Sequence, residues 1–400
     1  MSYCRRRDIS GAIYKYGVRV LKLSLSAKSE DFRLKFRAWL TLNPPPALGG
    51  TSLAEFEKVG RRWQRTLSES NWLGSHWPSE YGGRGLSLVE EAIVQEELVR
   101  VAAPQILGLF GITMVGPVLI NYGTPEQKSR FLSKILSGDE IWCQGFSEPG
   151  AGSDLAAVKT AAVPVEGGYN LTGQKIWTSF AHCAEWCFVL CRTSQGAKKH
   201  DGLSYLLVPL NSPGVTVRPL TQISGDSEFN EVFFDKVFVP KENLVGQEGQ
   251  GWKIAISTLM FERVVLTFSR QLQSEVALRA LIRESVPFLS GSQRIELAHC
   301  IADACATRAL AYKHLMEYSD RSQPGPEGSL DKLLWSESFQ RLCGFALSLS
   351  GSKAALGESD TEVGAAAHRY LYSRGRTIAA GTSEIQRSII SERLLGLPRG

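Results

Sequence analysis

Residues 144–154 read QGFSEPGAGSD, and the rest of the chain is arranged around this run. It contains Gly150 and Gly152 together with the hydroxyls of Ser147 and Ser153. Glycines let a backbone approach a flat polar ligand closely, and successive free N–H groups can bind its oxygen atoms. The run therefore has the chemistry of a ligand-binding loop.

A second short motif follows in the same region. Trp177 lies in a run with strand composition and offers a broad aromatic face, and Thr178 and Ser179 place two hydroxyls beside it. A flat ring system needs such a face and hydrogen bonds at its edge. We interpret the loop, from Gln144 onward, and the Trp177 motif as halves of one cofactor site.

The periodicity changes on both sides of this site. Residues 30–140 have helical apolar spacing, residues 141–245 carry short β-branched runs between turns, and residues 246–400 return to the helical period. Residues 1–29 form a basic leader, for which a targeting segment and a disordered leader both stay open. The prediction is an α+β protein with an N-terminal helical domain, a central β domain and a C-terminal helical domain.

Two of the N-terminal helices carry clear start signals. Ser87 precedes a helical run with Glu90 three residues on, and Thr124 precedes another with Gln127 three residues on. Both patterns predict a capping box, in which cap and third residue bond each other's backbone. The GGRG run at 82–85 has no strand before it and predicts a turn rather than a phosphate loop.

The helix after Gly251 carries a second candidate for chemistry. Residues 252–269, WKIAISTLMFERVVLTFS, are apolar almost all round, which is typical of a buried helix, yet they include Glu262 and Arg263. A carboxylate in apolar surroundings has a raised pKa, as a general base working near neutral pH requires. An ion pair with a basic group of another helix explains the pattern equally well.

The last motif is AAGTSEIQR at residues 379–387. Thr382 or Ser383 can cap a helix there, and Ser383 with Gln386 predicts a capping box. The free N–H groups of such a terminus can receive a phosphate. Taken alone, the motif indicates only a well-capped helix.

The charge balance excludes a nucleic-acid-binding protein. Of 45 Lys and Arg and 40 Asp and Glu, seven bases and two acids lie in residues 1–30, so the remainder carries 38 of each. A balanced surface cannot supply the concentrated charge that phosphate backbones need. The uncharged run 101–124 is interrupted by Pro104, Pro117 and glycines, so we expect an interior helix and no transmembrane segment.

The eight cysteines are too sparse for a disulfide scaffold and indicate a reducing compartment. Cys183, Cys187 and Cys191 recur every four residues, but no His pair stands at ligand spacing, so we predict buried thiols and no metal site. We expect a cytoplasmic bacterial protein rather than a mitochondrial one, because the leader is a poor transit peptide.

Taken together, three separated motifs resemble the acyl-CoA dehydrogenase family. They are SEPGAGSD at 147–154, KIWTS at 175–179 and GTSEIQR at 381–387, in the order that the family has. The resemblance runs from about residue 30 to the end. It implies an N-terminal helical domain, a central β domain and a C-terminal helical bundle, with FAD between the last two.

The resemblance also implies roles for individual residues. Cofactor contacts fall to Gln144, Phe146, Ser147, Ser153, Trp177, Ser179, Thr382 and Glu384. Trp177 lies against the isoalloxazine ring of FAD with Ser179 at its edge, and Thr382 and Glu384 hold the rest of the dinucleotide, in the same or a neighbouring subunit. Ser153 and Arg263 are assigned to the substrate, and the segment 101–122 lines the acyl pocket.

The implied reaction is the α,β-dehydrogenation of an acyl-CoA thioester. A carboxylate removes the α-proton, hydride passes from the β-carbon to the flavin, and electrons leave through an electron-transfer flavoprotein. Many members place the base directly before the glycine of the last motif, where this chain has Ala380. Others place it before an arginine on the first helix of the C-terminal domain. Glu262 before Arg263 matches the second arrangement, so we predict Glu262 as the catalytic base.

Two departures from the family keep another function open. The arginine that binds the FAD pyrophosphate across a subunit interface has only Arg283 as a counterpart, and the glycine-rich stretch near residue 350 reads SLSGSKAALG. Both features resemble bacterial members that work as paired, unlike subunits, some on bulky sterol-derived thioesters. The chain is predicted to be an active dehydrogenase in a homo- or hetero-oligomer, a dimer or tetramer. A non-catalytic or half-site partner subunit is the alternative, and an acyl-CoA oxidase is a weaker one.

Overall fold

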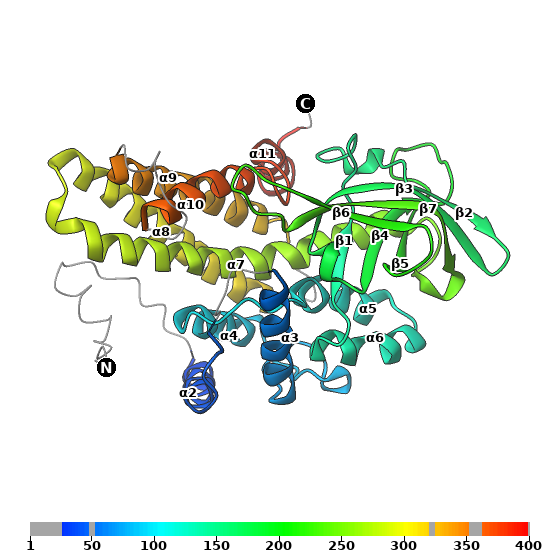
Figure 1. Ribbon diagram of the computed structural model, residues 1–400, viewed down its shortest axis with the longest axis horizontal. Coiled ribbons are helices and arrows are strands. Elements are labelled where there is room, and N and C mark those ends of the chain that lie inside the picture. Colours follow the sequence, from blue (N-terminus) through cyan, green and yellow to red (C-terminus); the bar gives the residue numbers. More distant parts are fainter. Residues whose placement is uncertain (1–25, 48–52, 320–324, 352–361, 399–400) are drawn as a thin grey trace.

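Helices, a central sheet and further helices follow one another in the computed structural model, as the sequence predicted (Figure 1). The structure describes residues 26–47, 53–319, 325–351 and 362–398, and at residues 53, 262–268, 284, 319 and 362–364 it describes the backbone alone. The predicted leader lies almost entirely outside the described residues. In Figure 1 the C-terminal helices form an elongated bundle on the left, the sheet lies on the right, and the N-terminal helices pack below.

The N-terminal part consists of helices whose starts follow from local sequence. They are α2 (Ala27–Leu42), α3 (Leu53–Glu69), α4 (Leu88–Arg100), α5 (Gly116–Tyr122) and α6 (Pro125–Ser137). Both predicted capping boxes are confirmed, at Ser87 before α4 and at Thr124 before α6. α2 begins inside the predicted leader because the Ser26 hydroxyl accepts a hydrogen bond from Ser29 N.

The uncharged segment between α4 and α6 is interior, as predicted, but only partly helical. The chain leaves α4 through Ala102, whose φ is +52°, and helix resumes only at residue 109. A π-helical turn (Gly111–Val115) then leads into α5, and residues 111–119 are buried throughout. No helix among the described residues is long and apolar enough to cross a bilayer. The GGRG run forms the predicted turn, in which Gly82 has a φ of +85°.

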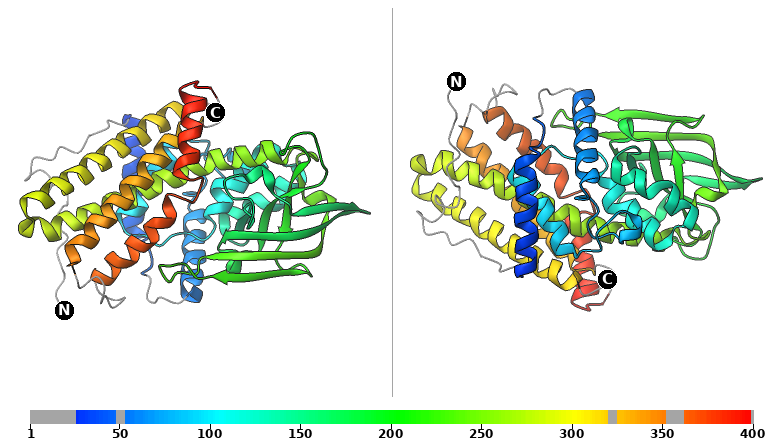
Figure 2. Two further views of the ribbon diagram at one scale, coloured as in Figure 1. Left: turned by 90° about the horizontal axis from the view of Figure 1, so that it is seen from above. Right: turned by 90° about the horizontal axis from the view of Figure 1, so that it is seen from below.

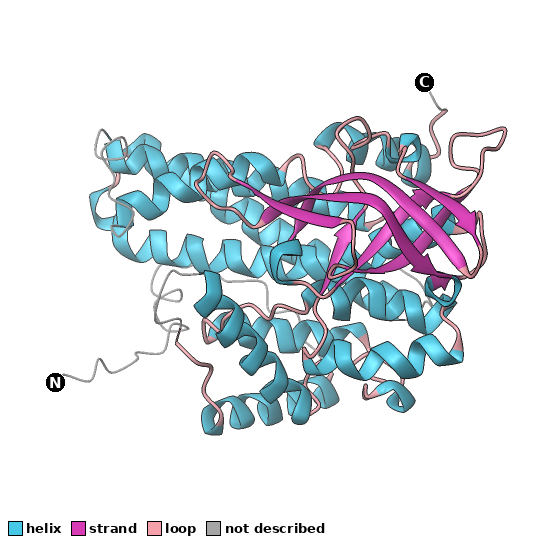
Figure 3. Cartoon of the chain, turned by 45° about the vertical axis from the view of Figure 1, so that its right-hand side comes forward, coloured by secondary structure: helices cyan, strands magenta, loops and turns pink. Residues whose placement is uncertain are grey.

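The central part is one eight-stranded sheet. Its strands are β1 (Trp142–Gly145), β2 (Ala161–Val165), β3 (Gly168–Ser179), β4 (Trp186–Arg192), β5 (Leu203–Pro209), β6 (Val215–Leu220), β7 (Phe229–Pro240) and β8 (Leu244–Val245). They lie in the order β6-β7-β3-β2-β4-β5-β8, and β1 pairs in parallel with β4. The pairing of β3 with β7 shifts register between Lys175 and Thr178, so β3 bends where Trp177 lies. Figure 3 shows the sheet against the helices of both other parts.

The C-terminal part is a bundle built on one long helix. Its helices are α7 (Gly251–Ser285), α8 (Gly291–Ser319), α9 (Gly328–Ser350), α10 (Glu362–Arg376) and α11 (Ser383–Ile389). α7 packs on α8 and α9, and it also contacts α4, α5, β4 and β5, so one helix touches all three parts of the chain (Figure 2). Its first turns enter the main core, where Ile254 and Ala255 are buried with Met114 and Val118.

The start of α11 corrects one prediction. The box predicted for Ser383 with Gln386 is wrong, because Thr382 is the N-cap and its hydroxyl accepts from Ile385 N at 3.3 Å. Ile385, not Gln386, is therefore the third helical residue. The amide of Gln386 instead donates to the Ala380 carbonyl at 2.8 Å and reaches back over the preceding turn.

A buried ionic cluster ties the N-terminal helices to the bundle. Glu96 of α4 accepts hydrogen bonds from Arg33 of α2 and from Arg308 and Tyr312 of α8. Arg308 also bonds Glu275 of α7 at 2.9 Å. Burial opposes the charged form of Glu96, but Arg308 and Arg33 outweigh it and hold the pKa of this carboxyl below its usual value.

Replacing Glu96 by Gln should lower the free energy of unfolding by about 3–5 kcal/mol, because a broken buried ion pair leaves its partner cations unpaired. Urea unfolding followed by circular dichroism measures this loss. Since folding lowers the pKa of Glu96, its contribution is complete above the unfolded pKa of about 4.3 and is lost as pH falls through the folded value. Asp31→Asn, which removes the exposed pair with Lys35, is the control and should cost less than about 1 kcal/mol. Equal losses in the two variants would contradict the prediction.

Candidate functional site

The loop at residues 144–154 lies against β3, directly before Trp177. β1 ends at Gly145, and Glu148 and Ala151 then exchange two backbone hydrogen bonds of 3.1 and 3.0 Å around a tight turn. Ile176 N donates to the Ser147 carbonyl at 2.9 Å. Backbone hydrogen bonding therefore brings the loop and the Trp177 motif together.

A buried ion pair fixes the loop on the strand. Lys175 is fully buried, and its Nζ donates to Glu148 Oε1 at 2.8 Å and to the Phe146 carbonyl at 3.0 Å. The Glu148 carboxylate also accepts from Lys159 N and Thr160 N. Burial opposes the charge of Glu148, but Lys175 and these donors hold its pKa below the usual value. Burial lowers the pKa of Lys175 against the attraction of Glu148.

Trp177 is presented outward in a strained conformation. Its φ is +60°, in the left-handed region that residues other than glycine rarely adopt, and the residue is 57% exposed. Such a backbone costs on the order of 1–3 kcal/mol and persists only where the surroundings impose it. The indole packs edge-on against Phe229, with ring centroids 5.9 Å apart. The other face of the ring is thus a surface on which a planar ligand can stack.

The glycine side of the loop is open. A Cβ added at Gly150 or Gly152 would meet no other atom within 4 Å, and Ser153 is exposed beside them. Two buried polar atoms of this region, Gln144 Nε2 and Thr178 Oγ1, have no hydrogen-bond partner among the described residues. An aromatic face, open glycines and unpaired polar atoms fit the isoalloxazine ring of FAD, which is flat and has polar edges.

Phe146 and Ser179 take different positions in this site. Phe146 is buried and packs edge-on against Phe188 and Tyr205, and its carbonyl accepts from Lys175, so its ring does not face a ligand. Ser179 is half-buried at the end of β3, opposite Phe229. The ring of Phe146 therefore supports the loop from the core.

Thr382 and Glu384 belong to a separate place in the fold. Thr382 is the N-cap of α11 and Glu384 lies in its first turn, and α11 packs on α9. The Thr382 hydroxyl is engaged as the helix cap, whereas Glu384 is exposed. The joint role of the two groups of predicted cofactor residues stays a prediction.

Glu262 and Arg263 lie within α7, in its first half. Their side chains are outside the described residues, so the structure places only their backbone. Sequence reasoning missed Lys175 and Glu148 as the pair that holds the site. The available signal was a lysine inside a run of strand composition. Where both faces of a strand are covered, such a lysine is buried and needs a buried partner.

The three spaced cysteines do not form a cluster. Cys187 and Cys191 are buried on β4, and Cys183 lies in the turn before it. In the described part of the chain, no group of three or more His, Cys, Asp or Glu side chains lies close enough to hold a metal ion.

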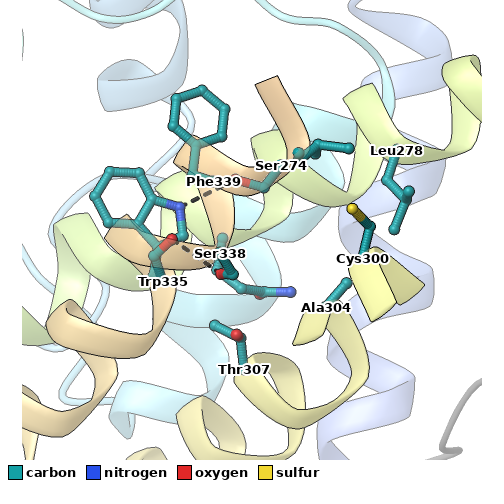
Figure 4. Close-up of a pocket in the computed structure, with 10 residues that line it drawn as sticks. Ser274, Leu278, Cys300, Ala304, Thr307, Trp335, Ser338 and Phe339 are labelled. Atoms are coloured by element: carbon teal, nitrogen blue, oxygen red, sulfur yellow. Dashed lines mark hydrogen bonds between the residues drawn. The ribbon is translucent and has the colours of Figure 1, made fainter. Parts of the chain in front are cut away.

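A cavity inside the bundle is distinct from this site (Figure 4). It lies between α7, α8 and α9 and is lined by Gln271, Ser274, Leu278, Cys300, Ala304, Thr307, Trp335, Ser338, Phe339 and Leu342. Its volume of about 20 Å³ has room for about one water molecule. Trp335 Nε1 donates to Ser274 Oγ at 3.0 Å in its wall. A dinucleotide cannot bind there, and we interpret the cavity as a packing gap.

Family models match three consecutive parts of the chain. The acyl-CoA dehydrogenase N-terminal domain matches residues 28–139, the middle domain residues 143–237 and the C-terminal domain residues 249–395. The chain belongs to the acyl-CoA dehydrogenase family. Members of this family are FAD-dependent oxidoreductases, so the predicted family, fold class, enzyme class and cofactor are confirmed.

Known relatives agree with this assignment. Acyl-CoA dehydrogenase IpdE1 of Mycolicibacterium smegmatis is 41% identical over 387 residues, which cover 92% of this chain and 98% of the relative. The IpdE1 of Mycobacterium tuberculosis is 42% identical over 384 residues, with the same coverage. The ChsE4-ChsE5 complex from Mycobacterium tuberculosis has a TM-score of 0.81 at 29% identity, covering 95% of this chain and 100% of that chain. The Tcur3481-Tcur3483 steroid ACAD has a TM-score of 0.80 at 28% identity, with equal coverage.

Gly150→Leu should weaken FAD binding at least about tenfold, or about 1.4 kcal/mol, because the new side chain enters the open space beside the loop. The thermal midpoint of the flavin-free protein should stay close to that of the wild type, since the side chain meets no protein atom. Quenching of FAD fluorescence during titration measures the affinity. Gly291→Leu, at an equally open glycine at the start of α8, is the matched control. Unchanged FAD affinity in Gly150→Leu would place the ring elsewhere.

Proposed function

We propose that the chain catalyses the α,β-dehydrogenation of an acyl-CoA thioester to a trans-2-enoyl-CoA. The observation that carries the proposal is the strained, exposed Trp177 beside an open glycine loop that the buried Lys175–Glu148 pair holds in place. Bound FAD supplies the acceptor for the hydride that leaves the β-carbon. The residues of the chain bind the ring, orient the thioester and accept the α-proton.

Glu262 is the proposed catalytic base. Its carboxylate takes the α-proton as the carbon–carbon double bond forms, and Arg263 and Ser153 are proposed to contact the substrate. The position before the glycine of the last motif carries Ala380, whose methyl group cannot accept a proton. α7 supports the assignment, because it is the one helix that contacts the sheet, α4 and α5 together among the described elements.

The segment 101–122 is proposed as a wall of the acyl pocket. Met114 and Val118 are fully buried in the cluster that holds Ile254 and Ala255 of α7. These α7 residues lie about two turns before Glu262, so an acyl group between α5 and α7 has an apolar wall close to the base.

Glu262→Gln should retain FAD but strongly slow the bleaching of the flavin by acyl-CoA, because an amide cannot take the α-proton. We expect the rate of flavin bleaching under anaerobic acyl-CoA to fall about 10²–10⁴-fold, the usual contribution of a general base. Stopped-flow absorbance at the flavin band measures it. Glu242→Gln, at an exposed carboxylate near β8, is the control and should keep the wild-type rate. If the flavin of Glu262→Gln bleaches at the wild-type rate, another residue is the base.

The electrons are proposed to pass to an electron-transfer flavoprotein, and the chain is proposed to act as an oligomer in the bacterial cytoplasm. Both IpdE1 relatives are bacterial. Production of hydrogen peroxide during aerobic turnover would instead indicate an acyl-CoA oxidase, in which O₂ takes the electrons.

A half-site subunit is the second candidate function. Arg283, the one counterpart of the pyrophosphate-binding arginine, is exposed near the end of α7, and two related structures are named for two proteins each, one of them a steroid ACAD. A steroid-type thioester shared with an unlike subunit is consistent with both facts. The visible spectrum of the chain purified alone distinguishes the candidates, because a self-sufficient enzyme is yellow and a half-site subunit is colourless until its partner is co-expressed.

A further inference from the structure

The connection between β6 and β7 passes the end of β3 and extends to α10 (Figure 1). Its residue Glu228 accepts a backbone hydrogen bond from Phe180 N at 2.7 Å, directly after the end of β3. The next residue, Phe229, packs on Trp177. Glu228 therefore lies beside the end of β3, next to the residue that packs on Trp177.

That contact is Arg376, the last residue of α10. Arg376 Nη2 donates to Glu228 Oε1 at 3.4 Å, and its guanidinium carbon lies 3.8 Å from the centre of the Tyr372 ring. The Tyr372 hydroxyl donates to the same carboxylate at 3.3 Å. A second contact, between the Asp226 carboxylate and His368 Nε2, measures 2.8 Å. The β6–β7 connection is thus docked on α10 by the Glu228–Arg376 ion pair and by hydrogen bonds to Tyr372 and His368.

Arg376 is only partly satisfied by these contacts. Its side chain is 11% exposed, and among the described residues the long bond to Glu228 is the one hydrogen bond of a group with five N–H donors. Burial lowers the pKa of Arg376 to about 10, and the positive charge of nearby Arg270 contributes to that effect. Burial also raises the pKa of Glu228, against the attraction of Arg376. None of its nitrogen atoms is a buried atom without a partner, so the unused donors stay open to solvent or to a ligand.

We propose that Arg376 faces the bound flavin and that its positive charge favours the reduced, anionic form of FAD. Two electrons and one proton convert FAD to the anion FADH⁻, so reduction adds one negative charge to the ring system. A cation held at the end of β3 attracts that charge more strongly than it attracts the neutral oxidised ring. This inference rests on the flavin site of the proposed function.

The competing explanation is a purely structural one. A helix C-terminus favours a cation, and the pair with Glu228 would dock the β6–β7 connection on α10 without any effect on the flavin. The two explanations differ in the midpoint potential of bound FAD, which a docking contact leaves unchanged. A measurement of the midpoint potential of FAD therefore distinguishes the two explanations, whereas a reaction rate does not.

The experiment is a titration of the FAD-loaded protein, or of its complex with a partner chain, with dithionite in the presence of a reference dye. Arg376→Gln should shift the ratio of reduced to oxidised flavin about tenfold towards the oxidised form, or about 30 mV for a two-electron couple. Glu228→Gln should shift it the opposite way, because it removes the offsetting negative charge. Arg376→Lys should stay near the wild type. Arg374→Gln, on the same helix but bonded to Ser373 and Gln340, is the control without a shift.

An unchanged potential in Arg376→Gln with FAD still bound would overturn the inference and leave the docking role. Where Arg376→Gln fails to fold, Glu228→Gln decides, since a potential equal to or below that of the wild type contradicts a flavin-facing cation. Failure of the proposed function would give a different result. In that case acyl-CoA leaves the wild-type flavin unbleached, while the dithionite potentials still report on Arg376.

Discussion

The buried pair of Lys175 and Glu148 is the constraint on which the candidate site depends. It joins the glycine loop to β3 with a hydrogen bond of 2.8 Å, and backbone donors from the following segment complete the carboxylate. Loss of one partner of such a pair costs about 3–5 kcal/mol. That is larger than the strain of about 1–3 kcal/mol that the left-handed backbone of Trp177 carries. The free energy of the pair is therefore sufficient to hold the backbone of Trp177 in its strained conformation.

α7 connects the part of the chain that carries this site to the rest of the molecule. It contacts the sheet, the N-terminal helices and the bundle, so the segment that carries Glu262 is positioned by all three parts at once. The cluster of Glu96, Arg33 and Arg308 fixes the same relation from the N-terminal side. The proposed base, on a helix held in this way, needs no loop closure to reach a defined place, which is the advantage of building a site on regular elements.

The sequence predicted what local rules decide and missed what long-range contacts decide. The capping boxes at Ser87 and Thr124 depend on residues three apart, and both are present. The sequence left Thr382 and Ser383 open as the cap of α11 and wrongly predicted a capping box for Ser383, because both residues are suited and only the geometry of the preceding turn chooses Thr382. The Lys175–Glu148 pair and the contact of Glu228 with Arg376 join residues 27 and 148 positions apart, and no periodicity encodes such pairs.

The turn at Ala380 and Gly381 keeps a strained backbone although it carries no carboxylate. Both residues have left-handed φ values, of +57° and +91°, and an alanine there costs roughly 1 kcal/mol or more. The buried amine of Lys332 bonds the Gly381 carbonyl at 2.7 Å, and Gln386 bonds that of Ala380, so the strain is actively maintained. A turn kept at this cost without a carboxylate has a structural task, which is to begin α11 at Thr382. With the proposed base on α7, the position before the glycine needs no carboxylate, and an alanine there is sufficient to keep the turn.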